Sequence, residues 1–477
     1  MVQESSHPLV VDLDGTLILT DSLHENLIAL IKIKPYVIFK LIKLCFHSKV
    51  ELKKFVYEQT GYRAEQMPYR QELLEYIWHE KQNGRKIYLA TAAYEGIAEK
   101  TANYLQCFDD VIATNSRQNL KGINKLNAIQ EKIGQEFVYA GDNVADLVIW
   151  NEACGAIVVG KKVNQLTLKI QQSGTPVLKK WENTGFSITT WMKAIRIHQW
   201  LKNILLFVPL LTAFQFFDLH KLFTTFVGFV AFSLGASATY ILNDLWDIEN
   251  DRVHSNKMQR PFASGKLSIV QGITASLILL IIAAIIAINI SWMFFSVFLL
   301  YLLITTIYSL RLKQIILLDI IILSVLYTIR IFAGGVVTNI DLSYPLLAFS
   351  ISIFLSLATV KRCTELIAMP DEKKVIAGRG YIKSDLDILW PLGISTYIGA
   401  IILFGLYITA SETIVLYHVP ALLWLVQLLM IYLIGNLWMM TKRGLMNEDP
   451  IVFLIQDKKS LALLALIISI ILLARYL

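Results

Sequence analysis

The uneven distribution of apolar residues limits the fold of this chain more than any other feature. Roughly the first 185 of its 477 residues form a mixed polar sequence, and almost all long apolar runs come afterwards. A run of about 20 apolar residues can cross a bilayer as a helix, and a soluble core does not need many such runs. The sequence therefore predicts a soluble domain at residues 1–180, a linker with an interfacial helix at 181–200, and an all-α polytopic membrane domain at 201–477.

The apolar part contains nine candidate spans. They are centred near residues 209, 232, 280, 300, 326, 353, 399, 427 and 468. The loops after the even-numbered spans are rich in Lys and Arg, whereas the loops on the other side hold little beyond Lys221. By the positive-inside rule, the basic loops face the cytoplasm.

The start of the chain agrees with this orientation. Met1–Pro8 has no basic region followed by an apolar one, so we expect no cleavable signal peptide and a cytoplasmic amino-terminal domain. Nine spans then put the carboxyl terminus on the opposite side of the cytoplasmic membrane. Four scattered cysteines without a CxxC pair predict reduced thiols, and the net charge of +7 is attributed to the basic loops rather than to a nucleic-acid partner.

An acidic stretch, Asn243–Arg252, closes the second predicted span and is called the acidic motif below. On one helix, Asn243, Asp247 and Asp251 would share a face, and Asp244 would lie close to it. Such carboxylates repel one another unless they are neutralised, and Mg²⁺ bound to a phosphorylated substrate is the simplest neutraliser. The alternative is a solvated acidic helix end that is paired with the nearby arginines.

Further polar elements are expected on the same side of the membrane. The stretches at 308–313, 361–365 and 378–381 could frame one cavity with the acidic motif, in which an acidic wall holds metal and a basic wall holds phosphate. Arg330, inside a span, is expected to face this cavity or a helix dipole. Residues 191–203 alternate aromatic and basic side chains and predict an amphipathic interfacial helix, with His198 in the headgroup region.

Three short apolar runs in the amino-terminal domain predict parallel strands. Leu9–Val11 leads into Asp12 and Asp14, residues 86–90 end at Thr91, and residues 137–140 end at a loop that contains two more aspartates. The carboxyl ends of strands are where open α/β sheets bind ligands. Residues 20–85 have a helical pattern and predict a cap over this edge.

These pieces, in this order, resemble the haloacid dehalogenase-like (HAD) phosphohydrolases over about residues 8–160. The resemblance implies a Rossmann-like α/β fold with a helical cap. It makes Asp12 the nucleophile and Asp14 the general acid and base, with Thr91 binding the phosphoryl oxygens and Lys125 neutralising charge. Lys121 competes for the lysine role. The implied Mg²⁺ ligands are Asp12, Asp14, Asp142 and Asp146. A degenerate domain kept for docking is the alternative.

Nine spans with NDxxDxxxD at the end of the second resemble the UbiA superfamily of intramembrane prenyltransferases, over about residues 190–477. Typical members carry a second DxxxD motif after the sixth span, for the other Mg²⁺ of a prenyl diphosphate. This chain has KRCTEL and GRGY there instead, and Asp385 and Asp387 are wrongly spaced. RIHQWLKN, YSLRLK with Leu318-Asp319, RIFAGG, KRCTEL and GRGY are closer to one branch, the decaprenyl-phosphate phosphoribosyltransferases.

In that branch, a polyprenyl phosphate oxygen attacks the anomeric carbon of 5-phosphoribosyl diphosphate. The resemblance implies one Mg²⁺ in the membrane domain, held by Asn243, Asp244, Asp247 and Asp251. The implied substrate-binding residues are Lys202, Asn203, Arg252, Lys257, Arg260, Tyr308, Lys313, Lys361, Arg362, Glu365, Arg379 and Tyr381.

Together the two resemblances imply a bifunctional membrane enzyme with a Mg²⁺ site in each domain. It would transfer 5-phosphoribosyl to a polyprenyl phosphate, and the HAD domain would then remove a phosphate, giving polyprenyl-phosphoryl ribose. The sequence is compatible with an oligomer. The alternatives are a conventional prenyltransferase that uses a prenyl diphosphate, and a lipid-binding or transport protein regulated by a HAD module.

Overall fold

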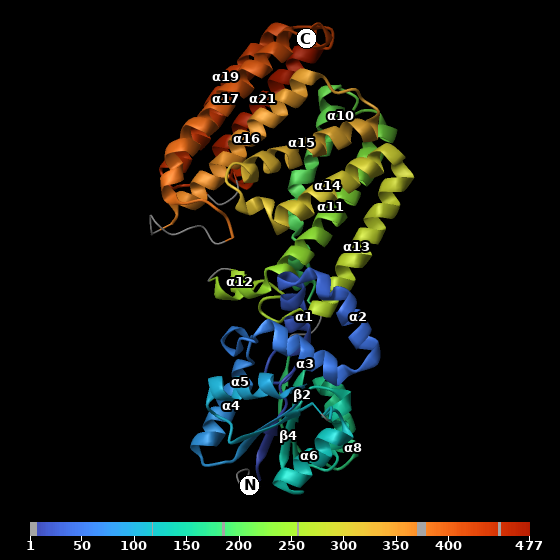
Figure 1. The fold of residues 1–477 in the computed structure, drawn as a ribbon. Helices are drawn as coiled ribbons and strands as arrows, with labels where there is room; N and C mark the ends of the chain where they lie inside the picture. The colour runs from blue at the N-terminus through green and yellow to red at the C-terminus, as the bar shows by residue number, and fades with distance from the viewer. Residues whose placement is uncertain (1–6, 117, 184–186, 255–256, 370–377, 447–449) are drawn as a thin grey trace. The chain divides into compact units, whose positions relative to one another are not determined.

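The computed structural model describes residues 7–116, 118–183, 187–254, 257–369, 378–446 and 450–477 (Figure 1). The chain forms two compact units. The first combines Met1–Arg196 with Tyr240–Leu277, and the second combines Ile197–Thr239 with Ile278–Leu477. The first unit therefore holds the predicted soluble domain and also the acidic motif, although the two are far apart in the sequence.

A six-stranded parallel sheet with the order β3-β2-β1-β4-β5-β6 forms the centre of the first unit. Its strands are β1 (Leu9–Val11), β2 (Ile87–Tyr94), β3 (Asp110–Thr114), β4 (Val138–Gly141), β5 (Gly155–Gly160) and β6 (Val177–Glu182). Val10 of β1 pairs with Tyr88 of β2 on one side and with Tyr139 of β4 on the other. The three strands predicted from the sequence are therefore present and adjacent, and their carboxyl ends meet at one edge.

Helices cover both faces of this sheet (Figure 1). Leu9 and Val11 pack on one face with Ile77 of α4 (Gln71–Gln82) and with α5 (Glu95–Leu105). Val10 packs on the other face with Ile129 of α6 (Ile123–Ile133) and with α8 (Val163–Gln172). Because both faces are buried, β1 is an unbroken apolar run rather than an alternating one.

A helical insertion with its own small core follows β1. It consists of α1 (Ser22–Ile33), η1 (Pro35–Val37), α2 (Ile38–His47) and α3 (Lys49–Thr60), and Leu30, Leu41 and Val56 pack together inside it. Helix α4, by contrast, packs on the sheet. Of the cap predicted at residues 20–85, only the part from α1 to α3 thus has a core separate from that of the sheet. The remaining helices of the first unit are η2 (Ala64–Gln66), η3 (Val144–Asp146), α7 (Leu147–Trp150), α9 (Ile188–Ala194), α12 (Ile248–Val253) and η5 (Lys257–Gln259).

The second unit is helical. Two helices, α11 (Leu219–Trp246) and α13 (Ile269–Ile290), contribute to both units. The others are η4 (Ile197–Phe207), α10 (Val208–Thr212), α14 (Trp292–Leu310), η6 (Leu312–Gln314), α15 (Leu318–Thr338), α16 (Tyr344–Ile367), η7 (Lys383–Asp385), α17 (Leu386–Thr409), α18 (Ser411–Ile414), η8 (Pro420–Leu422), α19 (Leu423–Lys442), α20 (Pro450–Gln456) and α21 (Lys458–Tyr476). Ile331, Leu357 and Trp438 belong to the core that α15, α16 and α19 share.

Among the described residues, eight helices are long and apolar enough to cross a membrane, one fewer than the nine predicted. They are α11, α13, α14, α15, α16, α17 with η7 before it, α19 with η8 before it, and α21. The predicted span near residue 209 is not a single long helix, because the chain passes from η4 into the short α10 where Pro209 lies. Proline cannot donate the backbone hydrogen bond of a continuous helix.

The predicted amphipathic helix at 191–203 is also interrupted. Helix α9 ends at Ala194 and η4 begins at Ile197. Arg196, between them, has a φ of 52°, in the left-handed region that an α-helix does not use. The backbone therefore turns at this arginine, and the aromatic and basic side chains of the stretch belong to two separate elements.

Candidate functional site

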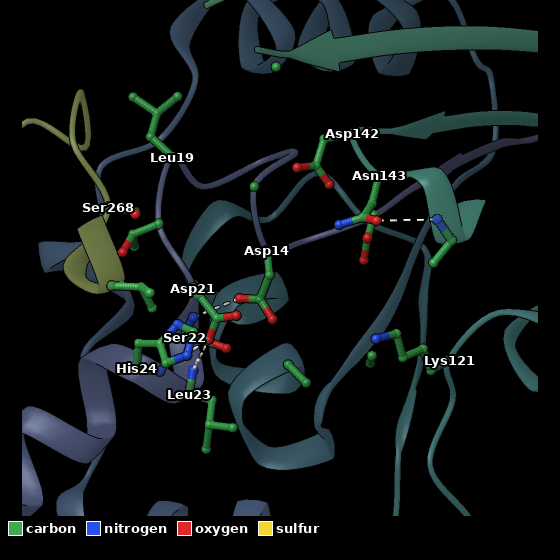
Figure 2. Close-up of a pocket in the computed structure, with 18 of the residues that line it drawn as sticks. Asp14, Leu19, Asp21, Ser22, Leu23, His24, Lys121, Asp142, Asn143 and Ser268 are labelled. Atoms are coloured by element: carbon green, nitrogen blue, oxygen red, sulfur yellow. Dashed lines mark hydrogen bonds and ion pairs between the residues drawn. The ribbon is translucent and has the colours of Figure 1, made fainter. Parts of the chain in front are cut away.

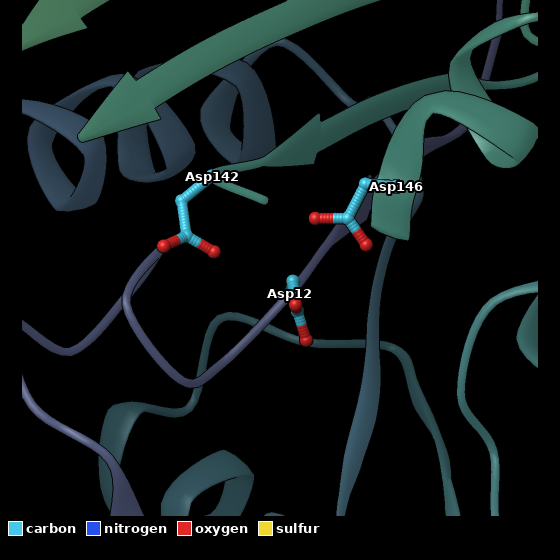
Figure 3. Close-up of side chains that lie close together, drawn as sticks. All are labelled: Asp12, Asp142 and Asp146. Carbon is cyan, nitrogen blue, oxygen red and sulfur yellow. The ribbon is translucent and has the colours of Figure 1, made fainter. Parts of the chain in front are cut away.

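Three carboxylates converge at the carboxyl edge of the sheet. Asp12 follows β1, Asp142 follows β4 and Asp146 ends η3, and each offers an oxygen within 4.8 Å of the others (Figure 3). Among the acidic, histidine and cysteine residues that the structure describes, this is the group that could share one metal ion. Carboxylate oxygens are the ligands that Mg²⁺ prefers.

A buried lysine completes this group. Lys125 Nζ, in the first turn of α6, lies 3.0 Å from Asp12 Oδ1 and 3.8 Å from Asp146 Oδ1. It also donates a hydrogen bond of 3.0 Å to the hydroxyl of Tyr139. Lys121, the competing candidate, is exposed on the pocket wall. The geometry therefore favours Lys125 for the role beside Asp12.

The charges of this site do not balance without a cation. Burial raises the pKa of Asp12 to about 6, although Lys125 opposes the shift. Burial also raises the pKa of Asp142 to about 7. Three carboxylates near one lysine leave negative charge in a buried place, and a divalent cation would neutralise it. The residues present therefore fit Mg²⁺.

Asp14 lies on the pocket wall beside the start of the insertion, near Asp21 and Ser22 (Figure 2). Its Oδ1 accepts a hydrogen bond of 2.8 Å from the amide of Ser22. Burial raises its pKa to about 8, and the charge of Asp21 contributes. A carboxyl group with such a pKa can hold a proton near neutral pH, which suits a general acid.

Two further residues shape the loop after β1. Gly15 has a φ of 75°, and a Cβ at this position would lie 2.3 Å from Asp142 Oδ2, so a side chain does not fit. Buried Arg70 donates from Nε to the Thr16 carbonyl (2.9 Å) and from Nη2 to the Gly15 carbonyl (3.0 Å). Arg70 was not predicted from the sequence, because an arginine just before a helix carries no motif signal.

Thr91, the predicted phosphoryl ligand, lies at the same edge but is buried in β2. Its hydroxyl accepts a hydrogen bond of 3.0 Å from the amide of Ala93. The residues that line the pocket include Ala92, Ala93 and Tyr94. The residues after Thr91 thus line the pocket, whereas the Thr91 hydroxyl is buried and engaged with the chain after it.

The pocket has a volume of about 650 Å³ and three kinds of lining (Figure 2). The sheet loops supply the carboxylates, the insertion supplies Lys53 and Tyr57 of α3, and the segment at the start of α13 supplies Ser268 and Gln271. Lys53 Nζ donates to the Ala92 carbonyl (2.6 Å) and to Asn119 Oδ1 (2.8 Å), so it ties α3 to the sheet loops. Lys53 was not predicted from the sequence, because most helical lysines are solvated.

The acidic motif differs from the single helical face that the sequence predicts. Helix α11 ends at Trp246, and Asp247 is the amino-terminal cap of α12 with φ −95° and ψ 11°. Asp244 and Asp251 are buried. Arg260 Nη1 lies 3.1 Å from Asp244 Oδ1 and 2.7 Å from Asp251 Oδ2. Arg196 also pairs with Asp244.

Asp244 and Asp251 are thus buried and paired with arginines, which differs from the solvated helix end that the sequence left open as the alternative. The Mg²⁺ role of the motif stays a prediction. Among the described residues, the group that could share one metal ion does not include these side chains. Asn243 is half-buried at the end of α11. Burial raises the pKa of Asp251 against the opposing charge of Arg260.

Arg252, a predicted phosphate ligand, is paired with the insertion. Its Nη2 lies 2.6 Å from Glu25 Oε1 and its Nη1 lies 3.2 Å from Glu25 Oε2. Its Nε donates to the Ala263 carbonyl at 3.0 Å. Both side chains are more than nine-tenths buried. Arg252 thus connects α12 to α1, and Lys257 lies half-buried in η5 nearby in the sequence.

In the second unit, Asp319 is the centre of a group that we name the arginine cluster. Its members are Tyr308, Asp319, Arg362, Glu365, Arg379 and Tyr381. Asp319 is fully buried, and its Oδ2 lies 2.7 Å from Arg362 Nε. Its Oδ1 lies 3.1 Å from Arg379 Nη1 and accepts a hydrogen bond of 2.8 Å from Tyr308. Asp319 belongs to one of the stretches that carry the resemblance, but it is not among the site residues predicted from the sequence.

The other members of the arginine cluster surround these contacts. Glu365 pairs with Arg362 and lies 3.7 Å from Arg379 Nε. The hydroxyl of Tyr381 accepts a hydrogen bond of 2.9 Å from the amide of Leu317. Arg362 Nη2 is buried and has no hydrogen-bond partner among the described residues. Lys313 and Lys361 lie in η6 and α16, next to the cluster in the sequence.

Arg330 and the end of RIHQWLKN form a separate buried group. Arg330 Nε donates to Asn203 Oδ1 (2.8 Å) and Nη2 donates to the Tyr301 hydroxyl (2.9 Å). Asn203 Nδ2 donates to Ser233 (3.0 Å). Lys202 Nζ lies 5.8 Å from the centre of the Tyr327 ring. Asn203, a predicted substrate ligand, is thus hydrogen-bonded to Arg330. The charged side chain of Arg330 finds its hydrogen-bond acceptors inside the helix bundle.

The model of the UbiA prenyltransferase family matches residues 204–454, slightly more than half of the chain. This chain belongs to the UbiA prenyltransferase family. The uncharacterized protein y4nM of Sinorhizobium fredii is 37% identical to this UbiA-family protein over 468 residues, which cover 97% of this chain and 90% of y4nM. That match includes the parallel sheet domain as well as the membrane helices.

Two further relatives match parts of this UbiA-family chain. Nodulation protein NoeC of Azorhizobium caulinodans is 34% identical over 287 residues, covering 59% of this chain and 92% of NoeC. Decaprenyl-phosphate phosphoribosyltransferase of Mycobacterium tuberculosis is 34% identical over 183 residues, covering 37% of this chain and 59% of that enzyme. The family membership, together with the eight candidate spans, makes this a multi-pass membrane protein.

Proposed function

We propose that this UbiA-family protein is a bifunctional membrane enzyme with both active sites on the cytoplasmic side. The membrane domain transfers 5-phosphoribosyl from 5-phosphoribosyl diphosphate to a polyprenyl phosphate and expels diphosphate. The sheet domain then hydrolyses the 5-phosphate of that product and leaves polyprenyl-phosphoryl ribose. The observation that carries the proposal is the group of Asp12, Lys125, Asp142 and Asp146, a phosphate-transfer arrangement in the same chain as a UbiA domain.

The residues of the sheet domain can carry out a phosphoryl transfer in two steps. In the first, Asp12 attacks the phosphorus, and Asp14 donates its proton to the departing ribose oxygen. In the second, Asp14 takes a proton from water, which attacks the phosphoryl-aspartate and releases inorganic phosphate. Lys125 keeps the nucleophilic carboxylate charged and aimed, because it lies 3.0 Å from it. Mg²⁺, held by Asp12, Asp142 and Asp146, would neutralise the charge of the phosphoryl oxygens.

The donor specificity rests on the arginine cluster. Its two arginines, Arg362 and Arg379, lie at the end of the sixth predicted span and just after it, where the sequence has no second DxxxD motif. Both pair with one buried aspartate, Asp319. Arginines can bind phosphate groups through bidentate hydrogen bonds. The partial match to a decaprenyl-phosphate phosphoribosyltransferase supports the same donor. We assign Arg362, Arg379, Tyr308 and Tyr381 to its phosphates, with Lys313, Lys361 and Glu365 beside them, and Lys202 and Asn203 to substrate positioning.

The acidic motif would hold Mg²⁺ on the diphosphate through Asn243, Asp244, Asp247 and Asp251. This role requires Arg260 to release Asp244 and Asp251, to which it is bound in the structure. The diphosphate offers the guanidinium group of Arg260 replacement acceptors, so the exchange keeps every charge paired. Lys257 adds a second cation, and Arg252 positions the motif through Glu25.

A conventional prenyl transfer is the second candidate, because the matching family model describes prenyltransferases. The donor distinguishes the two. Purified protein in lipid nanodiscs is supplied with Mg²⁺, polyprenyl phosphate and 5-phosphoribosyl diphosphate labelled in the ribose, and the lipid products are identified by mass. We expect polyprenyl-phosphoryl ribose from the intact protein. In a parallel assay the label is placed in a prenyl diphosphate instead. If that label is transferred and the ribose label never enters lipid, the prenyl assignment replaces the phosphoribosyl one.

The variant Asp12→Asn separates the two activities. It should accumulate the lipid that still carries the 5-phosphate, because only the second reaction needs the nucleophile. Asp251→Asn should instead stop the entry of label into any lipid. If Asp12→Asn releases the same product as the intact protein, the sheet domain acts on a different phosphate ester. Chelation of divalent ions should abolish both reactions.

A further inference from the structure

Helix α2 of the insertion exposes large apolar side chains. Phe39, Ile42 and Phe46 recur at three- and four-residue spacing, and they are 79%, 52% and 91% exposed. Tyr36, just before the helix, is 72% exposed. A contiguous group of such side chains on a soluble domain marks an interaction surface. We call Tyr36, Phe39, Ile42 and Phe46 the apolar face of α2.

This face is separate from the surface with which α2 packs. Leu41 is buried in the small core of the insertion together with Val37, Leu30 and Val56. The spacing of 41 against 39, 42 and 46 puts the two apolar surfaces on different sides of the helix. The core of the insertion therefore forms without the apolar face of α2, which stays available for another contact.

The segment that contains α2 is rich in lysine. Residues 31–50 contain five lysines, Lys32, Lys34, Lys40, Lys43 and Lys49, and no aspartate or glutamate. Lys40 and Lys43 are exposed on α2 itself, and Lys40 Nζ lies 4.0 Å from the centre of the Phe55 ring. An apolar face bordered by lysines is the pattern of helices that lie in the headgroup region of anionic bilayers.

We propose that α2 is a membrane-surface helix of this protein. Phe39, Ile42 and Phe46 enter the boundary between headgroups and acyl chains, while Lys40 and Lys43 bind anionic lipid headgroups. A bilayer is the occupant that fits, because the same chain has eight candidate membrane spans and is never far from lipid. The unmixed positive charge of residues 31–50 also matches an anionic lipid surface. This inference does not depend on the proposed catalytic activities.

Two natural cysteines provide a matched test. Cys45 on α2 and Cys154 before β5 are exposed, whereas Cys107 and Cys363 are buried. The full-length variants Cys154→Ser, labelled at Cys45, and Cys45→Ser, labelled at Cys154, carry the same polarity-sensitive fluorophore in nanodiscs that contain phosphatidylglycerol. We expect blue-shifted emission at Cys45, severalfold stronger quenching by a lipid-borne nitroxide and severalfold weaker quenching by aqueous iodide than at Cys154.

Further variants decide what covers the helix. Phe39→Glu with Phe46→Glu should make the Cys45 probe behave like the Cys154 probe, whereas Phe39→Leu with Phe46→Leu should preserve the difference. Circular dichroism checks that the variants fold. Equal iodide quenching at the two cysteines in nanodiscs overturns the proposal. Efficient cross-linking of Cys45 to a second copy in the same nanodiscs also overturns it, because a second copy then covers the face.

Discussion

Two lysines four residues apart lie near the carboxylates of the sheet domain, and burial separates them. Lys125 is 3% exposed and reaches Asp12, whereas Lys121 is exposed. Asp319 and Arg362 of the arginine cluster are likewise buried. A buried charge interacts more strongly with its neighbours than a solvated one. We therefore expect the largest effects of single substitutions at Lys125 and Asp319.

Lys125→Met should lower phosphate release by the sheet domain by about 10²–10³-fold, by analogy with the loss of one preorganised electrostatic contact. Lys121→Met is the matched control and should change the rate by less than about tenfold, because Lys121 is solvated. Phosphate release from the phosphorylated lipid product measures both. Equal losses in the two variants would show that Lys125 has no special part in the reaction.

Asp319→Asn should destabilise the membrane domain. It leaves two arginine side chains without their shared carboxylate, and breaking a buried ion pair costs about 3–5 kcal/mol. The heat-induced unfolding temperature in detergent measures the effect. Asp341→Asn, at an exposed aspartate between α15 and α16, is the control and should change stability by less than about 0.5 kcal/mol. A temperature shift no larger than that of the control would contradict the structural role of Asp319.

At the scale of elements, α12 is held by ion pairs on both of its sides. Arg260 connects it to the end of α11, and Arg252 connects it to α1 of the insertion. The break at Asp247 lets α12 leave the direction of α11, so that Arg252 can reach Glu25. The acidic motif and the insertion are therefore linked by this bidentate contact and by a hydrogen bond of 3.2 Å from Lys32 Nζ to the Trp246 carbonyl.

Glu25→Gln and Arg252→Gln should each speed hydrogen exchange in α1, because each leaves a buried charge without its partner. The double variant should exchange less than the sum of the single effects predicts, with a coupling energy of about 0.5–3 kcal/mol. Glu75→Gln, an exposed glutamate on α4, is the control. Additive effects of the two substitutions would show that the contact does not hold α1.

At the scale of the whole molecule, the segments that make up the first unit affect how many times we expect the chain to cross the membrane. Residues between α11 and α13 form one compact unit with the sheet domain. We therefore expect the carboxyl end of α11 on the same side of the membrane as that domain. If α11 crosses, the chain before Leu219 lies on the other side, and η4 with α10 must cross as well. Their 11 and 5 residues span about 30 Å, close to the thickness of the hydrocarbon core.

We therefore expect nine crossings and a carboxyl terminus on the side opposite to the sheet domain. Fusion of alkaline phosphatase to the carboxyl terminus should give an active reporter, because this enzyme folds only outside the cytoplasm, and a green fluorescent protein fusion should be dark. Fusions after residue 183 should show the reverse pattern. A bright fluorescent fusion at the carboxyl terminus would contradict the ninth crossing. It would show that η4 and α10 do not cross the membrane.

The sequence alone determined the features that depend on local pattern. Apolar runs predicted the strands β1, β2 and β4 and eight of the nine spans, because length and hydropathy suffice to identify them. Residue spacing placed Asp12, Asp142 and Asp146 at one sheet edge, because parallel strands end together. The same local signals did not reveal the non-helical geometry at Arg196 and Asp247, where backbone turns interrupt a helical pattern.

Only the tertiary structure decided which charges meet. Glu25 and Arg252 are 227 residues apart in the sequence, and Asp319 joins arginines from α16 and from the loop before η7. Opposite charges occur throughout the sequence, and no periodicity says which of them share a buried place. That choice depends on how the elements pack, because burial, which makes a pairing strong, is a property of the assembled fold.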